Sequence, residues 1–229
     1  MILPTFDYER KLTEQGFKNI AGADEAGRGS WAGPIVASAV VFSPIPPIPS
    51  TPLIRDSKKL SPKQREVAFQ QISSCAQIGV GIVEVDIIDK VGIGLANKLA
   101  FLNALMDLDN VPSYVLLDYL TISSNDLDLL YHLYPNANKE KTNNLKNLLP
   151  TCQKGIKFGD NFIASISAAS IVAKVTRDHI MIKLHNTYPD YNFRKNKGYP
   201  SKEHRDALKN LGPSPIHRKS FSPIGQLTF

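Results

Sequence analysis

Residues 19–29, with the sequence NIAGADEAGRG, decide the fold of this 229-residue chain. The first seven of them are predicted to form a short strand that ends in two acids, Asp24 and Glu25. Residues 35–42 follow as a second, strongly apolar strand. In open α/β sheets, ligands bind just beyond the carboxyl ends of the strands. The two carboxylates at the end of the first strand therefore indicate a functional site at that edge of the sheet.

Outward from these strands, apolar periodicity and start and stop signals predict further helices and strands. A stiff loop at 43–52 holds five prolines, and a helix at 61–73 then begins with Ser61 as N-cap and Pro62 at its first position. The other predicted strands cover 77–85, 113–118 and 155–158, and the other helices cover 93–108, 161–187 and 202–210, with weaker helical segments at 126–133 and 139–149. This order is typical of an α/β domain in which helices cover a mixed sheet.

A third acid, Asp118, closes the predicted strand at 113–118. If that strand neighbours the first one, its carboxylate converges with Asp24 and Glu25 at one edge of the sheet. Clustered carboxylates repel one another unless a hard cation neutralises them, and Mg²⁺ and Mn²⁺ prefer such oxygen ligands. Two ions about 3.5–4 Å apart would suit the hydrolysis of a phosphodiester. The alternative is that acids at strand ends simply solvate turns.

Gly27, Arg28 and Gly29 follow these acids directly. Glycines let backbone amides approach a phosphate closely, and Arg28 adds a charge-assisted contact. The spacing does not fit a dinucleotide-binding loop, because a strand follows where that motif requires a helix.

Charge is distributed unevenly along the chain, whose net charge is +6. Residues 151–229 carry 13 basic and 5 acidic side chains, a balance of +8, whereas residues 1–150 have a balance of −2. The C-terminal third is therefore predicted to face a polyanion, and the alternative is a solvated basic surface. The absence of a signal peptide, of a long apolar run and of a cysteine motif favours a cytoplasmic protein with two buried thiols and no contact with membranes.

Four segments of the sequence, in order, resemble the signature of bacterial ribonuclease HII. They are AGADEAGRG with the following AGP at 21–34, DSKKLS at 56–61, AASIVAKVTRD at 168–178, and KGY at 197–199 together with GPSPIHRKSF at 212–221. The resemblance covers most of the chain. It implies a ribonuclease H-like mixed five-stranded sheet flanked by helices, with residues 1–185 as the catalytic domain and residues 186–229 as a helical substrate-binding region.

The resemblance also implies four catalytic carboxylates that hold Mg²⁺ or Mn²⁺. Asp24, Glu25 and Asp118 match the first three, and Asp160 matches the fourth. An N-cap for the long helix is the alternative role of Asp160. Asp178 lies 18 residues further on, roughly 27 Å along a continuous helix, so it is excluded from the cluster and interpreted as structural together with Arg177.

The activity that the resemblance implies is two-metal hydrolysis of the RNA strand of RNA–DNA hybrids, and cleavage 5′ to single ribonucleotides in duplex DNA. The products carry 3′-hydroxyl and 5′-phosphate ends. The residues expected to bind substrate are Gly27, Arg28, Gly29, Lys58, Lys197 and Tyr199. The enzyme is expected to be a monomer, and the terminal QLTF at 226–229 is similar to tails that bind sliding clamps, although a frayed tail is the alternative.

Three departures from the family pattern bear on the site. Tyr119 follows the third carboxylate where a small residue is usual, the stretch between Asp118 and Asp160 is long, and Ser30 and Trp31 replace the common residues. Two other functions would also use these features: a non-catalytic nucleic-acid-binding module, and an integrase-like transferase on the same fold. Retention of all the matching acids disfavours the first, since carboxylates that face phosphates are unfavourable without metal. The Gly-Arg-Gly and Tyr199 segments disfavour the second.

Overall fold

A computed structural model describes residues 3–46, 54, 57–134 and 137–226. Most of the proline-rich segment, Asp56 of the second motif and residues 227–229 of the tail lie outside the described residues. The five strands form one mixed sheet in the order β3-β2-β1-β4-β5. They are β1 (Ile20–Ala26), β2 (Ile35–Val41), β3 (Gln77–Val83), β4 (Tyr114–Asp118) and β5 (Gln153–Ile156). β1 pairs antiparallel with β2 and parallel with β4, which confirms the predicted five-stranded mixed sheet.

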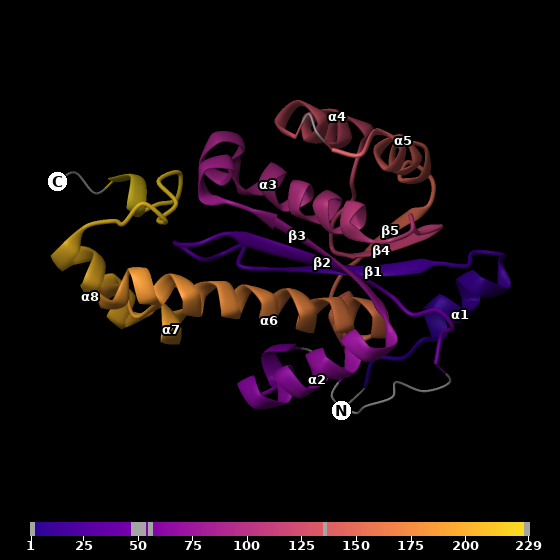
Figure 1. Ribbon diagram of the computed structural model, residues 1–229, viewed down its shortest axis with the longest axis horizontal. Coiled ribbons are helices and arrows are strands. Elements are labelled where there is room, and N and C mark those ends of the chain that lie inside the picture. The colour runs from indigo at the N-terminus through magenta and orange to yellow at the C-terminus, as the bar shows by residue number, and fades with distance from the viewer. Residues whose placement is uncertain (1–2, 47–53, 55–56, 135–136, 227–229) are drawn as a thin grey trace.

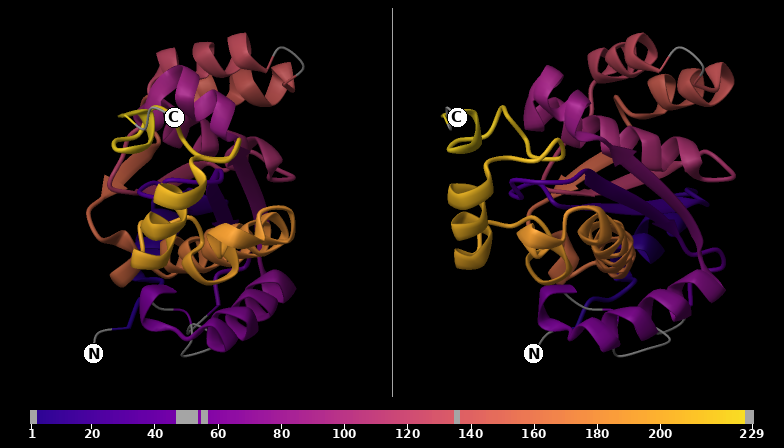
Figure 2. Two further views of the ribbon diagram at one scale, coloured as in Figure 1. Left: turned by 90° about the vertical axis from the view of Figure 1, so that its left-hand side faces the viewer. Right: turned by 60° about the vertical axis from the view of Figure 1, so that its left-hand side comes forward.

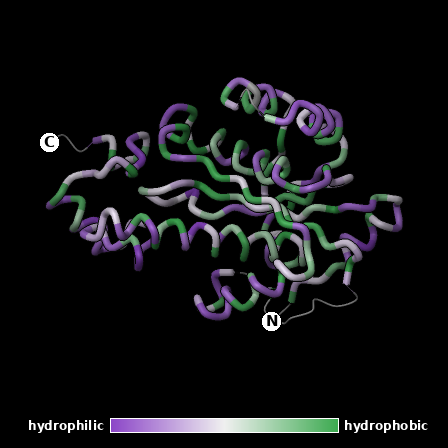
Figure 3. The backbone as a smooth tube through the Cα atoms, viewed as in Figure 1, coloured by the Kyte–Doolittle hydropathy of each residue, from purple (hydrophilic) through white to green (hydrophobic). Residues whose placement is uncertain are grey.

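Helices cover both faces of this sheet, and Figures 1 and 2 show the layers. On one face lies α3 (Val85–Asp107), with α4 (Ser124–Leu133) and α5 (Lys139–Leu148) on its far side. On the other face lies α6 (Ala164–Thr187), with α2 (Pro62–Cys75) beneath it. In Figure 3 the central strands are coloured mainly white to green, because both of their faces are buried.

The helices approach the sheet closely where the strands carry glycine. A side chain at Gly22 would meet the backbone of Ser165 in α6, 2.3 Å away. A side chain at Gly81 would meet the carbonyl oxygen of Ala100 in α3, 1.9 Å away. On the α6 side, the hydroxyl of Ser38 in β2 donates to the carbonyl of Ala169 at 2.8 Å. Because of this close contact, α6 and α3 fix the position of the strands relative to the side chains that the two helices carry.

Several boundaries differ from the sequence predictions. α3 begins at Val85 rather than near residue 93, with a break at Gly92 (φ 78°) that separates its first turns from the rest. α6 begins at Ala164 rather than at residue 161, and its N-cap is Ile163. The alternative role of Asp160 as the N-cap of this helix is therefore excluded, because Asp160 lies in the preceding 3₁₀ turn, Gly159–Asn161.

A helix that the sequence did not reveal, α1 (Asp7–Glu14), packs beside the start of α6. Its Glu9 side chain is buried, and Oε1 of Glu9 accepts a hydrogen bond from the backbone N–H of Ser165 at 2.9 Å. Glu9 thus caps the N-terminus of α6 from a different helix.

The C-terminal region continues from α6 through short helices and has a small core of its own. These helices are Pro189–Tyr191, α7 (Phe193–Asn196), α8 (Lys202–Leu211) and Ile224–Gln226. Tyr191 and Phe193 stack with ring centroids 5.4 Å apart, and Met181 of α6 belongs to the same buried cluster. The division of the chain at residue 185 stays a prediction, because α6 itself runs on to Thr187.

The remaining expectations from the sequence concern membrane-spanning segments and the two cysteines. Within the described ranges, no helix is long and apolar enough to cross a membrane. The expectation that both thiols are buried is wrong for Cys75, which is exposed at the end of α2, while Cys152 is partly buried.

Candidate active site

Three of the predicted carboxylates meet at the edge of the sheet where β1 and β4 end. The parallel register pairs Ala23 with Leu117, so Asp24 and Asp118 leave the sheet side by side. Asp24, Glu25 and Asp118 line one cavity of about 430 Å³. Asp118 also lines an adjoining cavity of about 590 Å³ together with Asp160. All four acids therefore surround two neighbouring hollows, and Asp118 belongs to both.

Adjacent strand residues point to opposite faces of a sheet, and this separates Asp24 from Glu25. Asp24 is buried and receives a hydrogen bond from Ser170 of α6. Glu25 receives one from Asn97 of α3, on the other face. Each acid is thus positioned by the helix that covers its own face of the sheet.

Burial and mutual repulsion raise the pKa of three carboxyl groups. The pKa of Asp24 is well above its ordinary value because the group is buried and faces Glu25 and Asp118. Burial likewise raises the pKa of Glu25 to about 7, against the opposing effect of Arg28. The pKa of Asp118 is raised by burial and opposed by the backbone N–H of Gly159, which donates to Oδ1 of Asp118 at 2.8 Å. Burial and crowding therefore disfavour the ionised forms of these three acids.

The donor set of this site is made of carboxylate oxygens. Among the residues that the structure describes, no three His, Cys, Asp or Glu side chains stand close enough together to hold a metal ion in their present arrangement. The chemistry of the donors nevertheless fits a hard divalent cation, whose charge would relieve the repulsion that raises these pKa values.

The two glycines of the Gly-Arg-Gly segment have different structural roles. Gly27 has a φ of 96°, and a side chain there would lie 2.0 Å from Nε of the buried Arg177, so this position requires glycine for packing and conformation. Gly29 is exposed, lines the first cavity and has nothing within 4 Å of an added side chain. Both glycines line the first cavity, and their contact with substrate stays a prediction. Arg28 is exposed at the rim of the same cavity.

Tyr199 lines the first cavity and is half-buried. Two cations lie near its ring, with Nζ of Lys174 at 5.7 Å and the guanidinium carbon of Arg177 at 5.3 Å from the ring centroid. The Arg177 guanidinium also donates to the carbonyl oxygens of Pro34 and Lys197 at 2.9 Å each. The buried arginine thus ties the segment before β2 to the segment before Tyr199, which agrees with its predicted structural role.

A buried pair of histidines, His204 and His217, supports the backbone of Tyr199. The backbone N–H of Ser214 donates to Nδ1 of His217 at 2.9 Å, so that nitrogen is the acceptor. His217 therefore donates from Nε2 to Nε2 of His204 at 2.9 Å, and His204 donates from Nδ1 to the carbonyl oxygen of Tyr199 at 2.9 Å. This chain of hydrogen bonds requires both rings to be neutral. The next residue, Arg218, donates to the carbonyl oxygen of Arg28 at 3.1 Å.

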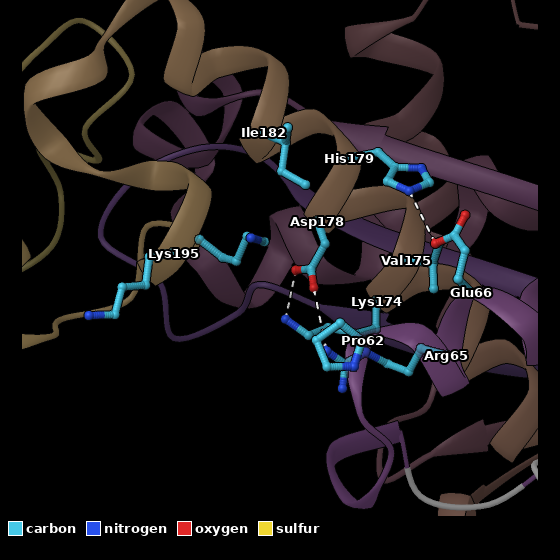
Figure 4. Close-up of a pocket in the computed structure, with 10 residues that line it drawn as sticks. Pro62, Arg65, Glu66, Lys174, Val175, Asp178, His179, Ile182 and Lys195 are labelled. Carbon is cyan, nitrogen blue, oxygen red and sulfur yellow. Dashed lines mark hydrogen bonds and ion pairs between the residues drawn. The ribbon is translucent and has the colours of Figure 1, made fainter.

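The predicted lysines occupy different places. Lys58 lines both cavities. Lys197 does not line either of them; it lies at a third hollow, of about 250 Å³. Figure 4 shows Arg65, Lys174 and Asp178 of this hollow. There Asp178 accepts from Nζ of Lys174 at 2.7 Å and pairs with Arg65 at 3.8 Å, so two cations hold it, and it lines neither of the cavities that the acids line. The structure therefore gathers the predicted substrate-binding residues into one cavity, with the exception of the Lys197 side chain.

Four residues of the site were not predicted from the sequence: Ser57, Asn97, Ser170 and Lys174. Ser57, Ser170 and Lys174 stand inside motifs that carry the family resemblance, and the hydroxyls of Ser57 and Ser170 are 3.0 Å apart. Asn97 is a polar residue in the apolar helix α3 and is buried, which is the signal that could have identified it.

Comparison with known proteins places these residues in a family. The sequence model of the Ribonuclease HII family matches residues 21–224. Ribonuclease HII of Bacillus subtilis (strain 168) is 41% identical over 218 residues, which are 95% of this chain and 74% of the relative. Ribonuclease HII of Wolbachia pipientis wMel is 42% identical over 226 residues, which are 99% of each protein.

Solved structures agree on the fold. Ribonuclease H2 of Pyrococcus horikoshii OT3 superposes with a TM-score of 0.65 at 26% identity, over 91% of this chain and 96% of the other. Two more distant structures show the fold alone. One is ribonuclease HII of Archaeoglobus fulgidus in complex with PCNA (TM-score 0.65, 23% identity, 87% and 93% of the chains). The other is Bst-RNase HIII in complex with Mn²⁺ (TM-score 0.64, 14% identity, 91% and 68%). The chain belongs to the ribonuclease HII family and is an endoribonuclease that hydrolyses the RNA strand of RNA–DNA hybrids.

Proposed function

We propose that this enzyme cuts with two divalent cations, Mg²⁺ or Mn²⁺, and that it also cleaves on the 5′ side of single ribonucleotides embedded in duplex DNA. The observation that carries the proposal is the convergence of four acids from three separate segments on two adjoining cavities. Asp24, Glu25, Asp118 and Asp160 would hold the ions. When bound, two such ions stabilise the attacking and the leaving oxygen of a phosphodiester hydrolysis, which leaves 3′-hydroxyl and 5′-phosphate ends.

The residues around the first cavity supply a route to recognition of a single ribose. The 2′-hydroxyl is the group that marks one ribose within DNA, and it both donates and accepts hydrogen bonds. The exposed backbone at Gly29 can approach it closely, and Tyr199, whose hydroxyl could bond the 2′-oxygen, lines the same cavity. Because Gly29 follows Glu25 by only four residues, a sugar bound at Gly29 would have a fixed position relative to the acids. Arg28 and Lys58 at the cavity would take the neighbouring phosphates.

The partners proposed for this chain follow from that activity. They are RNA–DNA hybrids and ribonucleotide-containing duplex DNA. The homologue of Archaeoglobus fulgidus was solved with PCNA, and the corresponding proposal for this chain concerns the tail, whose residues 227–229 lie outside the described part of the chain. Binding of a sliding clamp therefore stays a prediction, and so does the monomeric state.

A labelled duplex with one ribonucleotide, incubated with Mg²⁺, with Mn²⁺ or with EDTA, tests the proposal. We expect one cut at the 5′ side of the ribonucleotide with either ion and none with EDTA. Asp24→Asn and Asp118→Asn should each abolish the cut. Asp24→Asn should also raise the melting temperature, because the neutral amide removes a buried charge that is repelled by its neighbours. Cleavage in EDTA, or full activity of either variant, would contradict the two-metal proposal.

A further inference from the structure

The second cavity has a wall that the proposed chemistry does not use. Besides Asp118 and Asp160 it is lined by Tyr119 and Phe158, whose side chains are 66% and 60% exposed. Burial of an aromatic ring is strongly favourable, so two rings left this exposed indicate a surface that binds something. Each ring stands next to a catalytic segment, one directly after β4 and the other directly before the turn that holds Asp160.

The backbone at both rings is in the left-handed region. Tyr119 has a φ of 64° and Phe158 a φ of 60°, a conformation that bulky residues rarely adopt. Glycine or asparagine would adopt it at lower cost. Such strain typically persists at functional sites, and here it turns two aromatic rings toward solvent.

Cations accompany the rings. Lys59 and Lys157 line or flank the same cavity, and Nζ of Lys157 lies 5.4 Å from the ring centroid of Phe158. Aromatic faces combined with lysines form the surfaces on which proteins stack nucleotides while neutralising their phosphates. Acids that repel polyanions stand on one side of this surface, so an anionic strand would reach it most favourably once the acids carry cations.

We propose that Tyr119, Phe158 and Lys157 form a nucleotide subsite for the strand that is cut, upstream of the scissile phosphate. The inference rests on the proposed function: if Tyr199 and Gly29 hold the ribose on the 3′ side of the cut, the second cavity lies on the 5′ side, because Asp118 stands between the two. Each ring stacks on a sugar or base of the upstream strand, and Lys157 meets a phosphate of that strand.

Binding by fluorescence anisotropy in Mg²⁺ tests the subsite without catalysis when every protein also carries Asp24→Asn, which is expected to abolish cleavage. One labelled duplex carries a single ribonucleotide with ten upstream nucleotides on the same strand, and its partner lacks all but one of them. Tyr119→Asn and Phe158→Asn remove a ring but suit the left-handed backbone. We expect each to weaken binding of the long duplex by about tenfold, the usual effect of losing one stacked ring, and to leave the short duplex within about twofold.

Two controls separate the subsite from general effects. Phe162→Asn removes another exposed ring, 52% exposed, that does not line the cavity, and it should leave binding of both duplexes unchanged. Lys157→Gln should lower the slope of log affinity against log salt by about one for the long duplex alone. Equal losses on both duplexes, or no loss on the long one, would overturn the subsite. A wild-type enzyme that binds but does not cut with metal would instead overturn the proposed function and leave this comparison valid.

Discussion

Acid should weaken this protein through its buried histidine pair. His204 and His217 are fully buried, and each ring nitrogen already has a partner that fixes its protonation. A proton added to either ring would place two N–H groups face to face. Burial, and then the neighbouring His204, lower the pKa of His217 from 6.5 to about 4. The unfolded chain therefore binds a proton at this residue at a higher pH than the folded chain does.

The sign and size of the effect follow from that difference. Stability from His217 is complete above pH 6.5 and is lost as the pH falls toward 4, because the unfolded state takes up more protons in this range. With 1.36 kcal/mol for each unit of pKa, the loss at pH 5 is about 2 kcal/mol. The raised pKa values of Glu9 and Glu25 act in the opposite direction, since those groups take up protons more readily when folded. The total stability of the protein therefore does not isolate the histidine contribution.

Urea unfolding of the wild type and of His217→Gln at pH 5, 6, 7 and 8 isolates it. The glutamine amide can still donate to His204, but it does not titrate. We expect the variant to be the less stable protein at pH 8, and the difference from the wild type to shrink by about 2 kcal/mol at pH 5. Parallel stability curves for the two proteins across this range would show that His217 is not held neutral by its surroundings.

Three other predictions concern the substrate surface and its support. Lys197→Ala should reduce the slope of log affinity against log salt by about one, although Lys197 lies outside the catalytic cavity; an unchanged slope would remove it from the contact surface. Tyr199→Ala should reduce cleavage at a single ribonucleotide much more than cleavage within a long RNA–DNA hybrid, and equal losses in the two assays would assign Tyr199 to general binding. Gly27→Ala should cost about 2 kcal/mol or more of stability, because an added methyl group would clash with a buried guanidinium at positive φ. Gly29→Ala, in open space, should melt like the wild type but bind substrate less well, and equal melting temperatures of the two variants would refute the packing argument.

The parts of the fold with a strong local pattern were predictable from sequence. The apolar strands β1 and β2 and the capped start of α2 appear close to where the sequence placed them, and Ser61 forms the capping box of α2 with Gln64. The acids at the ends of β1 and β4 also meet as predicted, because parallel pairing brings strand ends to one edge. These features depend on short-range signals and on one topological rule.

The rest depends on tertiary contacts that leave little local trace. The first turns of α3 were missed because Gly92 and Gly94 are poor helix formers, and the structure indeed breaks the helix at Gly92. The hydrogen bonds of Asn97 and Ser170 to the catalytic acids join segments far apart in sequence. The exposure of Tyr119 could not be inferred either, since it follows from a left-handed turn and not from the residue type.

Through the cap that Glu9 provides, the N-terminal helix α1 supports the active site without contacting substrate. The first turn of α6 follows the Asp160 turn directly, and the same helix carries Ser170, which bonds Asp24, and Lys174, which flanks Tyr199. Its N-terminal amide at Ser165 depends on an acid about 150 positions earlier in the chain. Removing or shortening the first helix to obtain a smaller enzyme would therefore loosen the anchor of the catalytic helix, even though no residue of that segment reaches the substrate cavities.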